Sequence, residues 1–175
     1  AGALIIAVAF QVVEMFYVTT PYSAWCKHNA FRIITAALVL KISFLFLGWT
    51  YAWLFDLVIA ALLAGFAVTT LRRVKERKRR VSDVSIWFWS LGTALLLLAV
   101  AVHTAYLFSR VDALETIALI AFALFALSII LGMMGKIVPF LVWFHLSSAG
   151  YFDAPIMSNI IPQNFAKGVF WLFAI

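Results

Sequence analysis

Charged residues are scarce in this sequence. Only 11% of its 175 residues are Asp, Glu, Lys or Arg, whereas about one quarter of the residues of a soluble domain are charged. The composition therefore argues against an ordinary soluble domain. Nucleic-acid binding is not expected either, because it requires an extended basic face with base-reading elements.

Cysteine and histidine are also sparse. The single Cys26 rules out an internal disulfide and any site built from several cysteines. The three histidines form no His-x-x-x-His, Glu-x-x-His or CxxCH pattern, so a self-contained metal site is not expected. The sequence contains no complete catalytic motif.

Apolar residues dominate instead. They make up 66% of the chain, and the mean hydropathy is +1.10. The apolar runs are too long for strands and do not alternate with polar residues. The sequence therefore predicts an all-α, polytopic transmembrane helical bundle in a lipid bilayer. Residues 1–175 are expected to form one domain that is a segment of a longer chain or a subunit of a complex.

Five full crossings and a partial sixth are predicted. The five crossings are Ala1–Val18, Ile33 to the turn at Gly48–Tyr51, Ala52–Thr70, Val84–Phe108 and Ile117–Gly135. The partial sixth begins near Asn164, and Pro139 is expected either to kink a long helix or to start a separate one. Gly132 and Gly135 are small residues that allow close helix packing. Connections are expected at two more polar stretches, Thr19–Arg32 and Ser147–Lys167.

The run Leu71–Arg80, LRRVKERKRR, sets the predicted orientation. Short loops rich in Lys and Arg stay on the cytoplasmic side of a membrane, so this loop is expected to be cytoplasmic in the bacterial inner membrane. Alternating the helices from this loop places four other basic residues inside: Lys27, Arg32, Lys136 and Lys167. Its basic side chains are expected to contact anionic lipid headgroups: Arg72, Arg73, Lys75, Arg77, Lys78, Arg79 and Arg80.

Three charged residues lie within the apolar segments. Lys41 and Asp56 are each seven or eight residues from the predicted turn, so an antiparallel hairpin places both about 11 Å below it. A charge at such a position is usually paired or faces a cavity. The pair is interpreted as a salt bridge, with a proton or ion path and exposure at the interface as alternatives. Glu14 is either an interfacial carboxylate or a buried functional group.

Two of the histidines are candidate cofactor ligands. His103 lies within the apolar segment VAVHTAYLF, and His145 lies within VWFHLSS. An imidazole on a helix can hold haem iron, and the alternative is a satisfied or interfacial histidine. The two are expected at different depths, so that each would pair with a ligand from outside residues 1–175. His28, in the first inner connection, is not expected to be a ligand.

Two stretches resemble a known class of membrane protein. AFQVVEMFYVTTPY, Ala9–Tyr22, and GKIVPFLVWFHL, Gly135–Leu146, are similar to segments of bacterial polytopic membrane proteins related to the NnrS and haem-copper oxidase subunit I class. That class carries intramembrane histidines for haem and copper, and the resemblance implies His103 and His145 as their counterparts. In the class pattern a proline stands where this chain has Glu14, and an oxidase-like binuclear centre needs more histidines than these two.

Three functional hypotheses follow. The leading one is an inner-membrane protein that binds haem or metal for a nitric-oxide response or respiratory electron transfer. The second is a non-catalytic membrane subunit of a respiratory or transport complex. The third is a transporter fragment that uses Lys41 and Asp56.

Overall fold

The computed structural model describes Phe10, Val13, Glu14 and residues 21–48, 50–76, 83–151 and 160–175. Within these residues it is all-α and contains no strand. The all-α class predicted from the sequence is therefore confirmed. The helices are α2 (Ala24–Phe46), a 3₁₀ turn η1 (Thr50–Ala52), α3 (Trp53–Lys75), α4 (Val84–Ser109), α5 (Asp112–Ser148) and α7 (Gln163–Ala174).

Four of these helices contain a span that is long and apolar enough to cross a membrane. The spans are Lys27–Phe46, Trp53–Lys75, Val84–Ser109 and Asp112–Ser148. A helix needs about 20 apolar residues to cross the hydrocarbon core, so these four helices mark an integral membrane protein. The predicted crossing at Ala1–Val18 falls largely outside the described residues. The count of five crossings and a partial sixth therefore remains a prediction.

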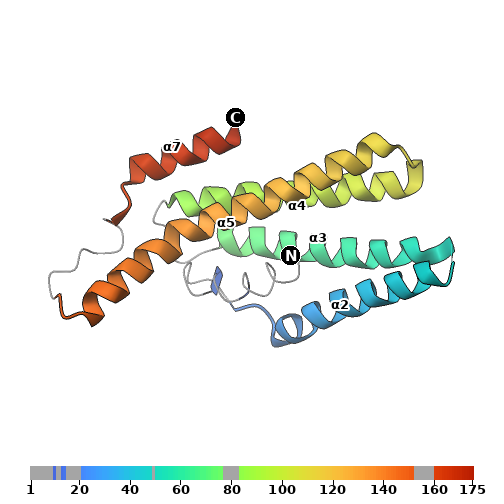
Figure 1. The fold of residues 1–175 in the computed structure, drawn as a ribbon, viewed down its shortest axis with the longest axis horizontal. Coiled ribbons are helices and arrows are strands. Elements are labelled where there is room, and N and C mark those ends of the chain that lie inside the picture. The colour runs from blue at the N-terminus through green and yellow to red at the C-terminus, as the bar shows by residue number, and fades with distance from the viewer. Residues whose placement is uncertain (1–9, 11–12, 15–20, 49, 77–82, 152–159) are drawn as a thin grey trace.

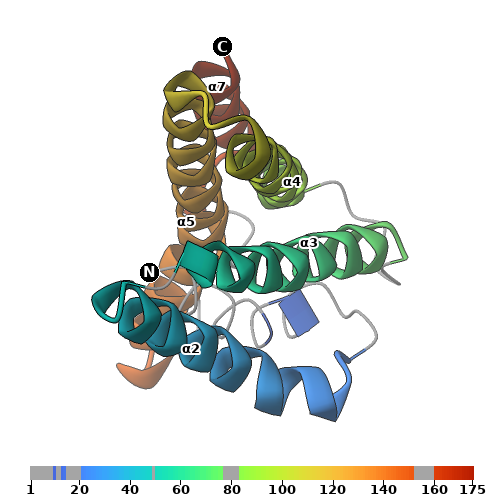
Figure 2. The ribbon, with the colours of Figure 1, turned by 90° about the vertical axis from the view of Figure 1, so that its right-hand side faces the viewer.

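The four long helices form two antiparallel hairpins. The turn between α2 and α3 and the turn between α4 and α5 lie at the same end of the bundle (Figure 1). Helix α4 packs against α3, α5 and α7, and α2 packs against α3. Figure 2, a view from the turn end, shows α3 and α5 diverging on either side of α4. The basic end of α3 and the start of α4 thus lie at the end opposite to the two turns.

Small residues bring α4 and α5 close together. A Cβ added at Gly132 would lie 2.9 Å from the Cβ of Phe88, so a larger residue does not fit there without a shift. Ser128 donates a hydrogen bond from Oγ to the backbone oxygen of Phe88 at 2.7 Å. Gly135, by contrast, has no such atom within 4 Å. Of the two glycines expected to allow close packing, only Gly132 lies at a helix contact.

Helix α5 continues without a break through Pro139. The alternative in which Pro139 starts a separate helix is therefore wrong. A proline ring crowds the carbonyl four residues earlier, which here belongs to Gly135. Gly135 has no Cβ and lies in open space, so the chain can adjust locally. At 37 residues, α5 is about 55 Å long and exceeds the roughly 30 Å hydrocarbon core.

Two expected connections are partly helical. Helix α2 begins at Ala24, nine residues before the apolar run at Ile33, so the connection predicted over Thr19–Arg32 is wrong from Ala24 onward. A helix can extend into the polar layer, because its backbone hydrogen bonds do not depend on apolar side chains. Both ends of the connection predicted over Ser147–Lys167 are helical as well, because α5 ends at Ser148 and α7 begins at Gln163. That start agrees with the segment expected near Asn164.

Candidate functional site

The structure brings together Lys41 and Asp56, the two residues that hairpin geometry predicts as neighbours. Lys41 Nζ of α2 lies 2.6 Å from Asp56 Oδ1 of α3, and their side chains are 30% and 14% exposed. Asp56 lies in the first turn of α3, where the partial positive charge of the helix N-terminus stabilises a carboxylate. The pair therefore joins α2 to α3 beside their turn.

Glu14 has a partner that could not be predicted from the neighbouring sequence. Its Oε2 lies 2.5 Å from Lys27 Nζ, and its Oε1 accepts a hydrogen bond of 2.5 Å from the backbone N–H of Tyr22. Lys27 falls within the connection predicted over Thr19–Arg32, whereas in the structure it lies in the first turn of α2. Lys27 lies next to Glu14 because α2 begins at Ala24. The number of residues between Glu14 and Lys27 does not by itself predict this contact.

Tyr22 extends this contact to the basic end of α3. Its hydroxyl lies 2.8 Å from Thr70 Oγ1, and the Arg73 guanidinium lies over its ring, 4.1 Å from the centroid. Tyr22 is 4% exposed, and burial raises the pKa of its hydroxyl above the ordinary value. Phe10 packs edge-on against Tyr22 and Phe66. These contacts hold the chain before α2 against α3.

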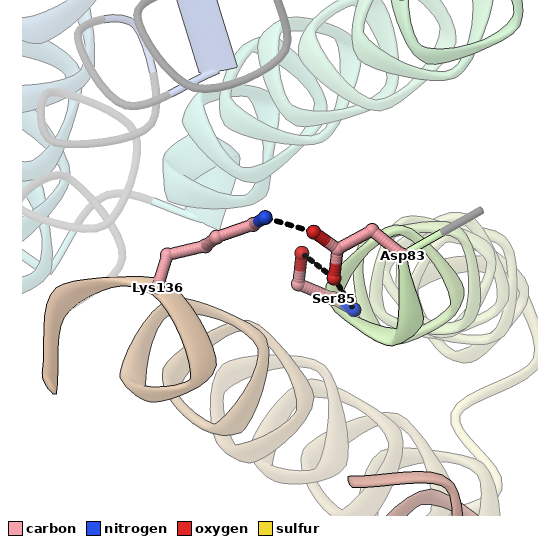
Figure 3. Close-up of polar contacts among 3 residues, drawn as sticks. All are labelled: Asp83, Ser85 and Lys136. Carbon is pink, nitrogen blue, oxygen red and sulfur yellow. Dashed lines mark hydrogen bonds and ion pairs between the residues drawn. The ribbon is translucent and has the colours of Figure 1, made fainter. Parts of the chain in front are cut away.

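A third ion pair joins α4 to α5. Asp83 caps the N-terminus of α4 and accepts hydrogen bonds of 3.0 Å from the backbone N–H and the Oγ of Ser85. Its other carboxylate oxygen pairs with the Lys136 ammonium of α5. Figure 3 shows Lys136 reaching from α5 to Asp83 at the start of α4. The Asp83 carboxylate thus caps the N-terminus of α4 and also joins α4 to α5.

His103 lies beside a cavity near the turn end of the bundle. The cavity has a volume of about 190 Å³ and lies between α3, α4 and α5. Asp56 and His103 are the only ionisable residues of the described chain on its walls, and the other lining residues are apolar. His103 is partly buried, and it makes no hydrogen bond to any residue that the structure describes. Its ring lies 6.1 Å from that of Tyr106.

The structure separates the two candidate haem ligands. His103 precedes the α4–α5 turn by two helical turns, and His145 lies near the far end of α5. At 1.5 Å per residue, the two lie about 40 Å apart along the hairpin. His145 and His28 are both exposed. In the described part of the chain, no three His, Cys, Asp or Glu residues gather as a metal site.

The predicted lipid-contacting residues are described only in part. Arg72 and Lys75 lie exposed in the last turn of α3, whereas Arg73 lies over the Tyr22 ring. Arg77, Lys78, Arg79 and Arg80 lie outside the described residues. The described side chains thus include two exposed cations at the end of α3, and their contact with lipid headgroups stays a prediction.

No protein-family model, curated protein or solved structure matches this chain. Its function is therefore inferred from the residues described above.

Proposed function

We propose that the chain is a helical module of a bacterial inner-membrane complex and serves as a non-catalytic subunit or segment of a respiratory or transport assembly. The observation that carries this proposal is the placement of its charges. Glu14–Lys27, Lys41–Asp56 and Asp83–Lys136 each join segments that are distant in sequence. They lie at separate places in the bundle and do not converge on one polar centre.

Charge pairs of this kind position helices. Removing one partner of a buried pair costs more than replacing both, so each pair favours one arrangement of its two helices. The apolar surface supports the same proposal, because α2 and α5 expose many large apolar side chains. Lipid and further helices are the natural neighbours of such surfaces. The proposed orientation places Leu71–Arg80 in the cytoplasm, with Ala1–Val18 as a fifth crossing and α7 as the start of a sixth.

Native mass spectrometry of the full-length protein, extracted from its own membrane in a mild detergent, tests this proposal. The expected result is a complex of fixed stoichiometry in which the protein is accompanied by at least one other membrane subunit. A matched measurement after extraction in a harsh detergent should release the protein alone. A protein that is monomeric under both conditions, and also after crosslinking in intact membranes, would contradict the proposal.

A second candidate function is haem binding, and the environment of His103 favours it. An imidazole in an apolar setting without a hydrogen-bond partner is unfavourable, and an iron atom would satisfy its free nitrogen. His103 fits the role of one axial ligand on these grounds. Haem bound there would supply electron transfer or nitric-oxide binding, and another helix would provide the second ligand. The distance to His145 rules out one haem shared by these two histidines.

The visible absorption spectrum of the complete protein tests the haem candidate. We expect a Soret band that His103→Ala abolishes or shifts, whereas His28→Ala, which changes an exposed histidine, leaves it unaltered. His145→Ala reports on a separate site at the other end of α5. A complete protein without a Soret band, purified from cells supplied with haem, would remove this candidate and leave the accessory-subunit proposal unchanged.

A further inference from the structure

The cavity between α3, α4 and α5 arises from the way the three helices meet. Both α3 and α5 pack against α4, and they diverge on either side of it (Figure 2). Alanines face the space between them on all three helices: Ala60, Ala99 and Ala118. Each of these alanines is at most 7% exposed. Side chains this small leave the space open where larger ones would fill it.

The polar groups beside the cavity do not call for a charged ligand. The Asp56 carboxylate is already paired with Lys41 at 2.6 Å, so its charge is balanced from α2. Apart from the His103 imidazole, the remaining walls are apolar and include Leu63 and Phe122. A charged ligand would lose its hydration there and gain no carboxylate or ammonium partner in return.

The size of the cavity sets the size of the ligand. An apolar cavity of roughly 150 Å³ stays dry and binds benzene or xenon, and this one has a volume of about 190 Å³. Pockets for drug-sized ligands are larger, about 300–1,000 Å³. A single six-membered ring therefore fits within this cavity. Such molecules dissolve in the bilayer, and they can reach a cavity between membrane helices from the lipid.

We propose that this cavity is a binding site for uncharged, single-ring apolar molecules taken from the membrane. The site lies in the half of the bundle that carries the two helix turns, and Ala60, Ala118 and Phe122 define its walls. The proposal goes beyond the accessory-subunit function and does not depend on it. An acyl chain of a lipid is the competing occupant, and the experiment distinguishes the two.

Fluorobenzene is the probe, and the full-length protein is studied in phosphatidylcholine nanodiscs. The relaxation of its ¹⁹F NMR signal is measured against protein-free nanodiscs, which report partitioning into lipid alone. The expected result is saturable binding that unlabelled benzene displaces and benzoate does not. A ¹⁹F relaxation rate equal to that in protein-free nanodiscs would overturn the proposal and would indicate that a lipid acyl chain fills the cavity. Displacement by benzoate as strong as by benzene would overturn the ligand class.

Cavity-filling variants locate the site. Ala118→Leu should weaken fluorobenzene binding by about ten-fold or more, because the added atoms occupy the cavity. Ala123→Leu is the matched control, since Ala123 lies on the same helix and is exposed; its affinity should stay within about two-fold. Ala60→Leu fills the same space from α3 and replaces the first variant if that one does not fold. Unchanged affinity in a folded cavity-filling variant would contradict the assignment.

Discussion

Lys41 Nζ lies 2.6 Å from Asp56 Oδ1, and this contact joins two neighbouring helices beside the turn that connects them. Each residue would be a lone charge in an apolar helix without the other. Together they form a neutral pair that restricts how α2 and α3 align. A second pair, Asp83–Lys136, joins α4 to α5 at the end opposite their turn. Among the described residues, each of the two hairpins therefore contains an ion pair between its helices.

Replacing one residue of the Lys41–Asp56 pair should lower the stability of the protein more than replacing both. Lys41→Leu or Asp56→Leu leaves one uncompensated charge, which costs about 3–5 kcal/mol in buried pairs; the expected loss falls below that range because this pair is partly exposed. The double variant should be less destabilised than either single variant. Thermal unfolding of the purified protein in one detergent measures all three. Losses that simply add in the double variant would show that the pair contributes no coupling.

Gly132 and Gly135 should respond differently to the same substitution. Gly132→Ala places a Cβ 2.9 Å from Phe88 Cβ, and overpacking of this kind costs about 1–3 kcal/mol. Gly135→Ala places its Cβ in open space and gains up to about 1 kcal/mol of helix propensity. The two variants serve as controls for each other in thermal unfolding. Equal destabilisation of both would contradict the close contact between α4 and α5 at Gly132.

Asp83 combines two roles that substitutions can separate. Asp83→Ala removes both the N-cap and the pair with Lys136, and the loss of a cap alone costs about 1 kcal/mol. Asp83→Asn keeps a capping oxygen and loses only the ion pair, which is partly exposed and contributes about 0–1 kcal/mol. We expect the alanine variant to be the less stable of the two. Lys136→Gln should resemble Asp83→Asn, and a larger loss for Asn than for Ala would contradict the capping role.

The long apolar helices could be predicted from the sequence, but only some of their first and last residues could. Val84 begins α4 as expected, and the structure shows that Asp83 caps this end. The sequence left open whether Pro139 kinks a long helix or starts a separate one, and α5 continues through it to Ser148. An interior proline either kinks or breaks a helix, and the sequence alone does not show which of the two occurs.

The ion pairs show the same limit. Lys41 and Asp56 could be matched because they lie at equal distances from one turn in a continuous apolar stretch. Glu14 and Lys27 could not, because the residues between them include Pro21 and the start of α2, whose path the sequence does not determine. The cavity beside His103 could not be foreseen either. It depends on alanines from three helices, and no spacing within one segment reports how three helices meet.

Thiol labelling from one side of the membrane, which reports the orientation of α4, is the most direct test of the proposed membrane arrangement. In a Cys26→Ser background, Lys75→Cys and Glu115→Cys place single thiols near opposite ends of the hairpins, and both native side chains are exposed. A membrane-impermeant maleimide is added to intact spheroplasts and, in parallel, to lysed ones. We predict that the thiol at position 115 is labelled in intact spheroplasts, whereas the thiol at position 75 is labelled only after lysis. Labelling of the thiol at position 75 in intact spheroplasts would contradict the arrangement.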